Sequence, residues 1–166
     1  MSEQRYTDEY WMQLAFEQAA QAAEHGEIPV GAIIVSQNQV IGRGFNAPIS
    51  LNDPTAHAEI VAIREACKHL DNYRLPDDAV LYVTLEPCTM CVGALVHSRI
   101  SRVVFGALEP KAGSLVSARQ LFNTGYYNHL FEFEGGCLQE ACSAQLSAFF
   151  KLRRAQKRME KLQEKS

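Results

Sequence analysis

The sequence predicts an α/β fold in which a mixed or parallel sheet is covered by helices on both of its faces. Strand-like apolar runs alternate with helix-like patterns along most of the 166 residues. Neither an internal repeat nor a Pro- or Gly-rich linker divides the chain, and this length suits one domain. We therefore expect residues 1–166 to form a single domain.

The first part of the chain predicts a helix followed by two strands. Residues 8–25 place apolar side chains at helical spacing, and Gly26 is a typical helix stop. Residues 29–35 and 40–46 are strand-like runs, and the polar residues 36–39 between them indicate a hairpin. One helix and an antiparallel strand pair are the expected outcome.

A second helix is predicted over residues 55–70. Asp53 suits the N-cap and Pro54 the first helical position, which would place His57 and Glu59 in the opening turns. The apolar run 79–85 predicts a buried strand. It leads to Pro87, which suits the first position of a further helix reaching about residue 97.

The last part of the chain predicts two more strands and a basic helix. Residues 101–106 and 130–134 are strand-like, a short helix is expected around 117–122, and the final helix covers about 138–166. Residues 145–166 hold seven basic and two acidic side chains, a local charge of +5, against nine basic and 17 acidic elsewhere. Such a confined basic helix indicates a phosphate-binding surface, although a solvated, fraying terminal helix is the alternative.

His57, Cys88 and Cys91 are the expected ligands of a zinc ion. Cys88 and Cys91 are three residues apart, so on a helix their sulfurs lie on one face. Three protein ligands are typical of catalytic zinc, which leaves its fourth position to water. Glu59 follows His57 by two residues, about 200° around a helix, and so would lie beside that water as a proton acceptor.

Two other kinds of site share the Cys-x-x-Cys spacing but fit this chain less well. A thioredoxin-like redox motif needs no His-x-Glu, and a zinc ribbon needs a second Cys-x-x-Cys. The remaining cysteines, Cys67, Cys137 and Cys142, are an odd set that favours a reducing compartment. Residues 1–6 lack signal-peptide features, and no apolar run approaches the roughly 18 residues of a membrane span. We therefore expect a cytoplasmic protein without a membrane partner.

His57-x-Glu59 together with Pro87-Cys88-x-x-Cys91 resembles the signature of the zinc nucleobase deaminases. Over about residues 10–154 the chain resembles more closely the bacterial tRNA-specific adenosine deaminases. The stretches that carry this resemblance are 30–32, 44–46, 53–59, 72–75, 82–88, 97–100 and 103–107, followed by Phe149-Phe150 and Arg153-Arg154.

The resemblance implies a three-layer α/β/α cytidine deaminase-like fold with a mixed five-stranded sheet. It implies one Zn²⁺ per subunit on His57, Cys88 and Cys91, with Glu59 as the proton shuttle. It also implies that Asn46 hydrogen-bonds the bound nucleoside and that a homodimer builds the RNA site. From the residues alone, Asn46 could equally end a strand and cap a turn.

The activity implied by this resemblance is hydrolytic deamination of adenosine to inosine at the wobble position of a tRNA anticodon stem-loop. Arg153, Arg154 and Lys157 are then the expected contacts to RNA phosphates. One alternative is a free nucleoside, nucleotide or base deaminase of cytidine, deoxycytidylate or guanine type. Another is a catalytically silent zinc module that recognises RNA. Glu59 argues against the silent module, and the basic helix argues mildly against a small-molecule enzyme.

The segment 108–117 departs from the family pattern. After Gly106-Ala107 the family usually has an aspartate and a Lys-x-Gly-Ala-x-Gly-Ser stretch, whereas this chain has Glu109, Pro110 and no second glycine. Proline and the missing glycine reduce the conformational freedom of this segment. We expect the difference to affect how nucleotides beside the target adenosine are held, and to leave the zinc chemistry unchanged.

Overall fold

The computed structural model describes residues 5–165. Residues 1–4, which belong to the segment considered for a signal peptide, and residue 166, the end of the expected last helix, lie outside this part of the chain. The elements in chain order are α1 (Asp8–Glu24), β1 (Gly31–Ser36), β2 (Gln39–Phe45), α2 (Ala58–Leu70), β3 (Val80–Leu85), α3 (Thr89–Ser98), β4 (Arg102–Ala107), the 3₁₀ helix η1 (Leu121–Asn123), β5 (Glu132–Glu134) and α4 (Gln139–Glu164).

The five strands form one mixed sheet in the order β2-β1-β3-β4-β5. Strand β1 is antiparallel to both β2 and β3, whereas β3 is parallel to β4 and β4 is parallel to β5. The predicted mixed five-stranded sheet is confirmed.

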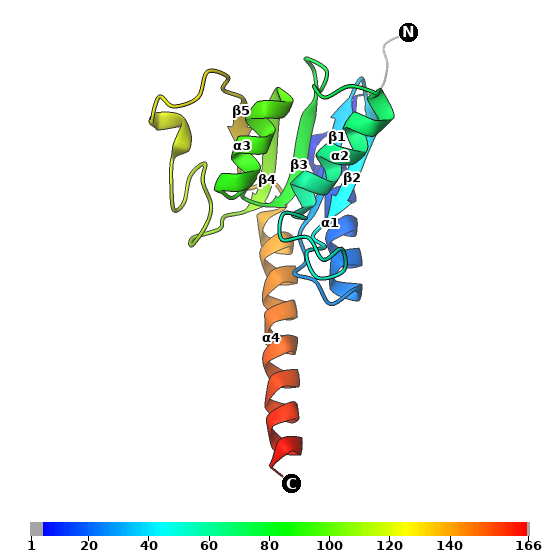
Figure 1. Cartoon of the computed structure of the whole chain (residues 1–166), viewed down its shortest axis with the longest axis vertical. Coiled ribbons are helices and arrows are strands. Elements are labelled where there is room, and N and C mark those ends of the chain that lie inside the picture. The colour runs from blue at the N-terminus through cyan, green and yellow to red at the C-terminus, as the bar shows by residue number, and fades with distance from the viewer. Residues whose placement is uncertain (1–4, 166) are drawn as a thin grey trace.

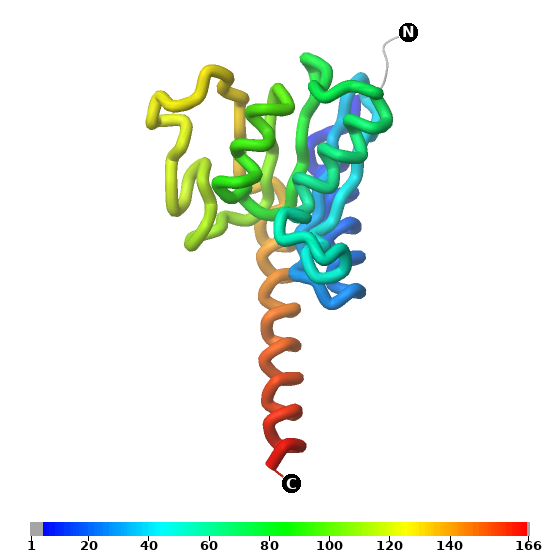
Figure 2. Tube along the Cα trace, viewed as in Figure 1, coloured from blue at the N-terminus to red at the C-terminus, as the bar shows by residue number. Residues whose placement is uncertain are grey.

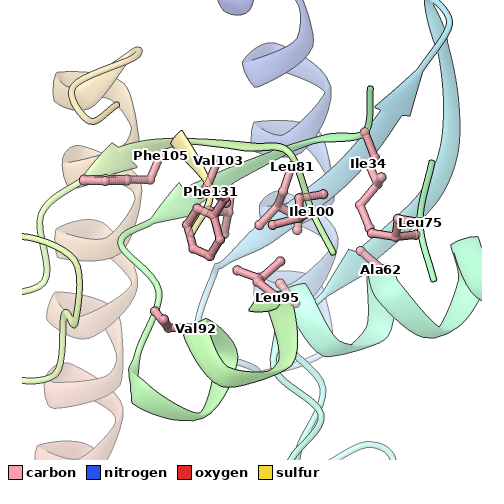
Figure 3. Close-up of a cluster of buried hydrophobic side chains, with 14 of the residues drawn as sticks. Ile34, Ala62, Leu75, Leu81, Val92, Leu95, Ile100, Val103, Phe105 and Phe131 are labelled. Carbon is pink, nitrogen blue, oxygen red and sulfur yellow. The ribbon is translucent and has the colours of Figure 1, made fainter. Parts of the chain in front are cut away.

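Helices cover both faces of this sheet, which gives the predicted three layers (Figure 1). Helices α2 and α3 pack on one face over the larger apolar cluster, which contains Ala62, Leu95 and Val103 (Figure 3). Helix α1 and the beginning of α4 cover the other face, where Trp11 and Cys142 belong to a second cluster. Burial of these two apolar surfaces is the main force that joins the layers.

Glycines allow α2 to lie directly on β2. A Cβ atom on Gly44 would collide with the carbonyl oxygen of Ala58 and the backbone nitrogen of Ala62. Because glycine has no Cβ, the helix backbone can approach the strand this closely. The contact fixes the first turn of α2 beside the end of β2, and so brings the segment after His57 close to Asn46.

The predicted start of α2 is wrong. Asp53 and Pro54 do not begin the helix, because the Asp53 carboxylate accepts hydrogen bonds from the Thr55 backbone N–H (2.9 Å) and hydroxyl (2.7 Å). Asp side chains compete in this way with helix formation. The helix begins at Ala58, and His57 is its N-cap, with extended backbone angles φ −69° and ψ 155°.

Helix α3 also begins later in the sequence than predicted. Cys88 is the N-cap and the helix begins at Thr89, so Pro87 precedes the cap and is not the first helical residue. His57 and Cys88 are therefore both cap residues. The extended backbone at a cap lets each side chain project across the start of its helix.

The structure also corrects the connection between β4 and β5. No regular α-helix occupies residues 117–122, and a single 3₁₀ turn lies at Leu121–Asn123 instead. Strand β5 covers only Glu132–Glu134, shorter than the predicted run 130–134. This long connection projects from the body of the molecule as a loop, coloured yellow-green to yellow in Figure 2.

Helix α4 leaves the body of the molecule and continues alone (Figures 1 and 2). Its 26 residues extend about 39 Å at the usual rise per residue. Phe149 is buried against the body, whereas nearly every side chain from Lys151 onward is exposed. Among the described helices, none combines the length and the apolar character that crossing a membrane requires.

Candidate metal centre and adjoining grooves

One edge of the sheet gathers the predicted site residues. Because β1 is antiparallel to β2 and to β3, the end of β2, the start of β1 and the end of β3 meet at the same edge. Asn46 follows β2 there, and Glu86 follows β3. The starts of α2 and α3 lie at this edge as well, and they carry His57 and Cys88.

His57, Cys88 and Cys91 come together as a compact donor set. Nδ1 of His57 lies 3.5 Å from Sγ of Cys88 and 3.6 Å from Sγ of Cys91. The three donor atoms are all within 4.8 Å of one another, and no other such group of three occurs in residues 5–165.

These separations suit a zinc ion. Sulfur and nitrogen ligands at their usual bond lengths, about 2.3 and 2.05 Å, stand about 3.5 Å apart when the angle between them is tetrahedral. The donor atoms therefore need little movement to coordinate zinc. A carboxylate is absent from the set, so the three ligands leave one position of a tetrahedron open.

The electrostatics of the donor set favour a thiolate. Hydrogen bonds from Cys91 and His57 lower the pKa of the Cys88 thiol to about 4. The hydrogen bond to Cys88 in turn raises the pKa of His57. Cys88 also caps α3, where the positive end of the helix dipole stabilises an anion. Thiolate sulfur is the form that binds metal ions.

Glu59 lies beside the donor set without joining it. It is in the first turn of α2, its side chain is only 4% exposed, and it borders the same cavity as His57 and Cys88. Burial raises the pKa of the Glu59 carboxyl to about 7. A carboxyl group with this pKa can both accept and return a proton at neutral pH.

The cavity next to the donor set has a volume of about 230 Å³. This is below the roughly 300 to 1,000 Å³ of most small-molecule pockets, and it suits a single flat ring system better than a larger ligand. Its lining comes from both sides of the sheet edge and comprises Ile28, Val30, Asn46, His57, Glu59, Leu85, Glu86, Cys88, Glu109, Ala112, Leu146 and Phe150.

The backbone of Asn46 is held by a hydrogen bond, whereas its side chain is available to bind a ligand. Its N–H donates to the carbonyl oxygen of Val30 at 3.0 Å, which holds the residue just past the end of β2. Within residues 5–165 its side-chain amide has no hydrogen-bond partner. An amide provides one acceptor and two donors, the set needed to recognise a polar ring edge or a sugar hydroxyl.

A second hollow of about 360 Å³ adjoins this cavity and shares Ile28, Asn46 and Phe150 with it. The three predicted RNA contacts, Arg153, Arg154 and Lys157, line this second hollow. The structure thus brings the basic helix to the mouth of the cavity, although more than 60 residues separate it from Cys91 in sequence.

The three basic residues differ in what they contact. The Arg153 guanidinium donates to the Gly26 carbonyl oxygen at 3.3 Å and lies over the Phe149 ring, 5.6 Å from its centre. Arg154 and Lys157 are exposed, and neither has an ion-pair partner among the described residues. Arg153 therefore helps to hold α4 on the body, whereas the other two cations face solvent.

Sequence reasoning missed two buried carboxylates near this edge. Glu27 accepts hydrogen bonds from the N–H groups of Ile49 (3.3 Å) and Ser50 (2.7 Å), which holds the loop after Asn46. Glu86 accepts hydrogen bonds from the segment 109–117. The only signal in the sequence was an acidic residue at the edge of each apolar run, and many surface residues share that signal.

Comparisons with known proteins agree with this geometry. The family model described as "Cytidine and deoxycytidylate deaminase zinc-binding region" matches residues 5–107. The tRNA-specific adenosine deaminase of Haemophilus influenzae is 50% identical over 155 residues, which cover 93% of this chain and 89% of that protein. The Bacillus subtilis enzyme of the same name is 44% identical, over 91% of this chain and 93% of its own length.

Solved structures give the same result. A structure from a study of A-to-I editing by tRNA:A34 deaminases at the wobble position of transfer RNA superimposes with a TM-score of 0.79 and 42% identity. The match covers 82% of this chain and 98% of that one. A guanine deaminase from Nitrosomonas europaea has a TM-score of 0.72 at 21% identity, over 89% of this chain and 86% of that one, which shows a shared fold only.

Proposed function

This chain belongs to the tRNA-specific adenosine deaminase family, and we propose that it converts adenosine to inosine at the wobble position of a tRNA anticodon. The observation that carries the proposal is the meeting of three zinc donors and one buried carboxyl, Glu59, at a cavity of ring size. The reaction is a zinc-dependent hydrolysis that consumes water and releases ammonia.

His57, Cys88 and Cys91 are the residues that would hold the zinc ion. When bound there, zinc would supply a water molecule whose pKa is lowered to about 7. We propose that the Glu59 carboxylate, which lines the same cavity, accepts the proton that this water loses. It then gives that proton to N1 of adenine while the water oxygen bonds to C6.

The second half of the reaction also depends on Glu59. Its carboxylate takes the remaining proton of the former water and passes it to the amino group on C6. The C6–N bond breaks and ammonia leaves, and the proton on N1 stays with the inosine product. Burial favours the protonated form of this carboxyl, which supports its acting first as base and then as acid.

We propose that Asn46 positions the base or its sugar. Its free side-chain amide lies in the wall that separates the cavity from the basic hollow. The adenosine must leave its stack to reach the cavity, which costs a few kcal/mol and is cheapest in a single-stranded loop. An anticodon loop meets this requirement.

The basic side of α4 is the proposed RNA contact. Phe150, Arg154, Lys157 and Lys161 recur at spacings of four, three and four residues and so lie on one side of the helix. Phe150 lines the cavity, so the cations extend from its mouth along α4. Arg153, which borders the same hollow, would support this surface.

We further propose that the protein acts as a cytoplasmic homodimer, one domain per subunit, in which the second subunit completes the RNA site. Ile49, Leu51 and Met90 support this, because they are 68%, 58% and 37% exposed and belong to segments around the site. A second subunit would bury this apolar surface. Sedimentation of the purified protein at micromolar concentration should give twice the 18.5 kDa mass of the chain.

The competing small-molecule activity can be separated from the proposed one in a single assay. The protein is incubated with an anticodon stem-loop that carries adenosine at the wobble position, and in parallel with free adenosine, cytidine and guanine. Inosine and ammonia are expected from the stem-loop alone. If any free nucleoside or base were turned over faster than the stem-loop, that small molecule would be the substrate and the proposed tRNA activity would be wrong.

A further inference from the structure

Glu86 is a buried carboxylate that accepts its side-chain hydrogen bonds from one segment of the chain, residues 109–117. It is 2% exposed, and no ion pair involves it among the described residues. Oε1 accepts hydrogen bonds from the Glu109 N–H (3.1 Å) and the Ser117 hydroxyl. Oε2 accepts from three consecutive backbone N–H groups, those of Leu115 (3.2 Å), Val116 (2.8 Å) and Ser117 (3.0 Å).

This arrangement makes the carboxylate and the segment depend on each other. A buried charge is tolerated only when hydrogen bonds replace its lost hydration. Consecutive N–H groups that converge on one oxygen form an anion-binding nest, which keeps its shape when an anion is present. Removing the carboxylate group would leave several backbone donors facing each other without an acceptor.

The segment 109–117 also contacts Cys88, a candidate metal ligand, and its two neighbours in sequence. Gly113 forms a β-bridge with Cys88, and the Ser114 N–H donates to the Pro87 carbonyl oxygen at 2.9 Å. The hydroxyls of Thr89 and Ser114 are 2.7 Å apart. A Cβ on Gly113 would collide with the Glu86 carboxyl, so glycine is required where the carboxylate passes the segment.

Two residues of the segment, Glu109 and Ala112, line the cavity beside His57 and Glu59. The same segment departs from the usual family sequence, and its last hydrogen-bond donor, Ser117, contacts Glu86 twice. The hydrogen bonds from Ser117 to Glu86 thus help to hold this part of the cavity wall.

We propose that Glu86 is a positioning residue for substrate binding, because its carboxylate folds the segment 109–117 into the cavity wall that contacts the RNA around the target adenosine. Both carboxylate oxygens are occupied by the segment, so Glu86 acts through it and not on the reacting atoms. This inference rests on the proposed function for the identity of the substrate.

The test compares the wild-type protein with Glu86→Gln. A glutamine has nearly the same shape, but its NH₂ group would face N–H donors in either amide orientation. We expect full zinc content, a kcat within about threefold of wild type, and a KM for the stem-loop raised about tenfold or more. Backbone amides of residues 109–117 should exchange hydrogen at least about tenfold faster, while those of β3 keep their protection.

Ser117→Ala is the matched control, because it removes one hydroxyl donor and leaves the carboxylate with four backbone donors. Its KM should stay within about twofold of wild type. Gly113→Ala is the independent variant, since it keeps Glu86 and crowds the carboxyl. It should raise KM with zinc retained, and it serves as the test if Glu86→Gln does not fold.

Wild-type KM and wild-type exchange in Glu86→Gln would overturn the proposal. So would loss of zinc from that variant, because the carboxylate would then support the metal site and not the cavity wall. Failure of the wild-type protein to deaminate the stem-loop would instead contradict the proposed function. Exchange in residues 109–117 would still show in that case whether Glu86 orders the segment.

Discussion

Nδ1 of His57 lies 3.5 Å from Sγ of Cys88, although 31 positions separate the two residues in sequence. Each residue caps a helix, and both helices begin at one edge of the sheet. The positive ends of two helix dipoles therefore point toward the candidate metal position, where they stabilise thiolate. Glu59 follows within the first turn of α2 and so lies at the same place without being a ligand.

Glu59→Gln should reduce inosine formation by a factor of about 10² to 10⁴, because the amide cannot shuttle a proton. Zinc content and affinity for the stem-loop should stay close to the wild-type values. Metal analysis, RNA binding and single-turnover assays measure the three quantities. Glu65→Gln, an exposed change on the same helix, is the control. Normal turnover in Glu59→Gln would remove this carboxyl from the mechanism.

Asn46→Ala should lower kcat/KM for the stem-loop by about 10- to 100-fold, the effect of losing a buried hydrogen bond worth about 1 to 3 kcal/mol. The zinc content should not change, because Asn46 is not part of the donor set. Asn123→Ala, an exposed change on η1, provides the comparison. If both variants had the wild-type kcat/KM, Asn46 would only end strand β2 and would not bind the substrate.

Binding of the stem-loop should weaken steeply as salt concentration rises. Each phosphate contact contributes about 0.7 to 0.9 to the slope of log K against log salt. Arg154→Ala and Lys157→Ala should each weaken binding and make the slope shallower by about that amount. Lys68→Ala, at the far end of α2, should leave the slope unchanged. A salt-independent complex would contradict a phosphate-binding role for α4.

Asp8 should make stability depend on pH. Hydrogen bonds from Arg102 (3.1 and 2.8 Å) and Tyr82 (2.8 Å) lower the pKa of its carboxyl. The stabilisation is therefore complete above the unfolded pKa of about 3.9 and is lost as pH falls through the lower folded-state pKa.

Asp8→Asn should accordingly lower the free energy of unfolding by about 1 to 2 kcal/mol at pH 7, a range reduced for partial exposure. The difference from wild type should shrink as pH falls below about 4. Urea unfolding at several pH values measures both quantities, with the exposed neighbour Glu9→Gln as the control. A difference that persists unchanged at low pH would show that the carboxylate charge is not involved.

Much of this arrangement could be predicted because it depends on local patterns. Alternating strand and helix periodicity indicated the layers, and the spacing of His57, Cys88 and Cys91 indicated the donor set. The helix starts were wrong by a few residues, because the Asp53 side chain satisfies a local turn and does not cap the helix. Propensity at a single position does not decide between these two hydrogen-bonding choices.

The role of Glu86 could not be predicted because it depends on contacts across more than 20 residues. Nothing in the sequence around Glu86 specifies that the backbone of residues 115–117 will converge on its carboxylate. The helix expected around residues 117–122 was misplaced for the same reason, since the N–H groups of residues 115–117 donate to Glu86 and only a 3₁₀ turn follows, at Leu121–Asn123. Tertiary hydrogen bonds override local preference in such connections.

A catalytic zinc ion on His57, Cys88 and Cys91 is best tested by titrating zinc into metal-free protein, with inosine formation in the anticodon stem-loop as the readout. Activity should be absent without metal and should rise to a plateau at one zinc per subunit, while a variant with His57, Cys88 and Cys91 all changed to Ala stays inactive. Full activity of the metal-free protein, or tight stoichiometric zinc binding by that triple variant, would rule out a catalytic zinc ion on these three residues.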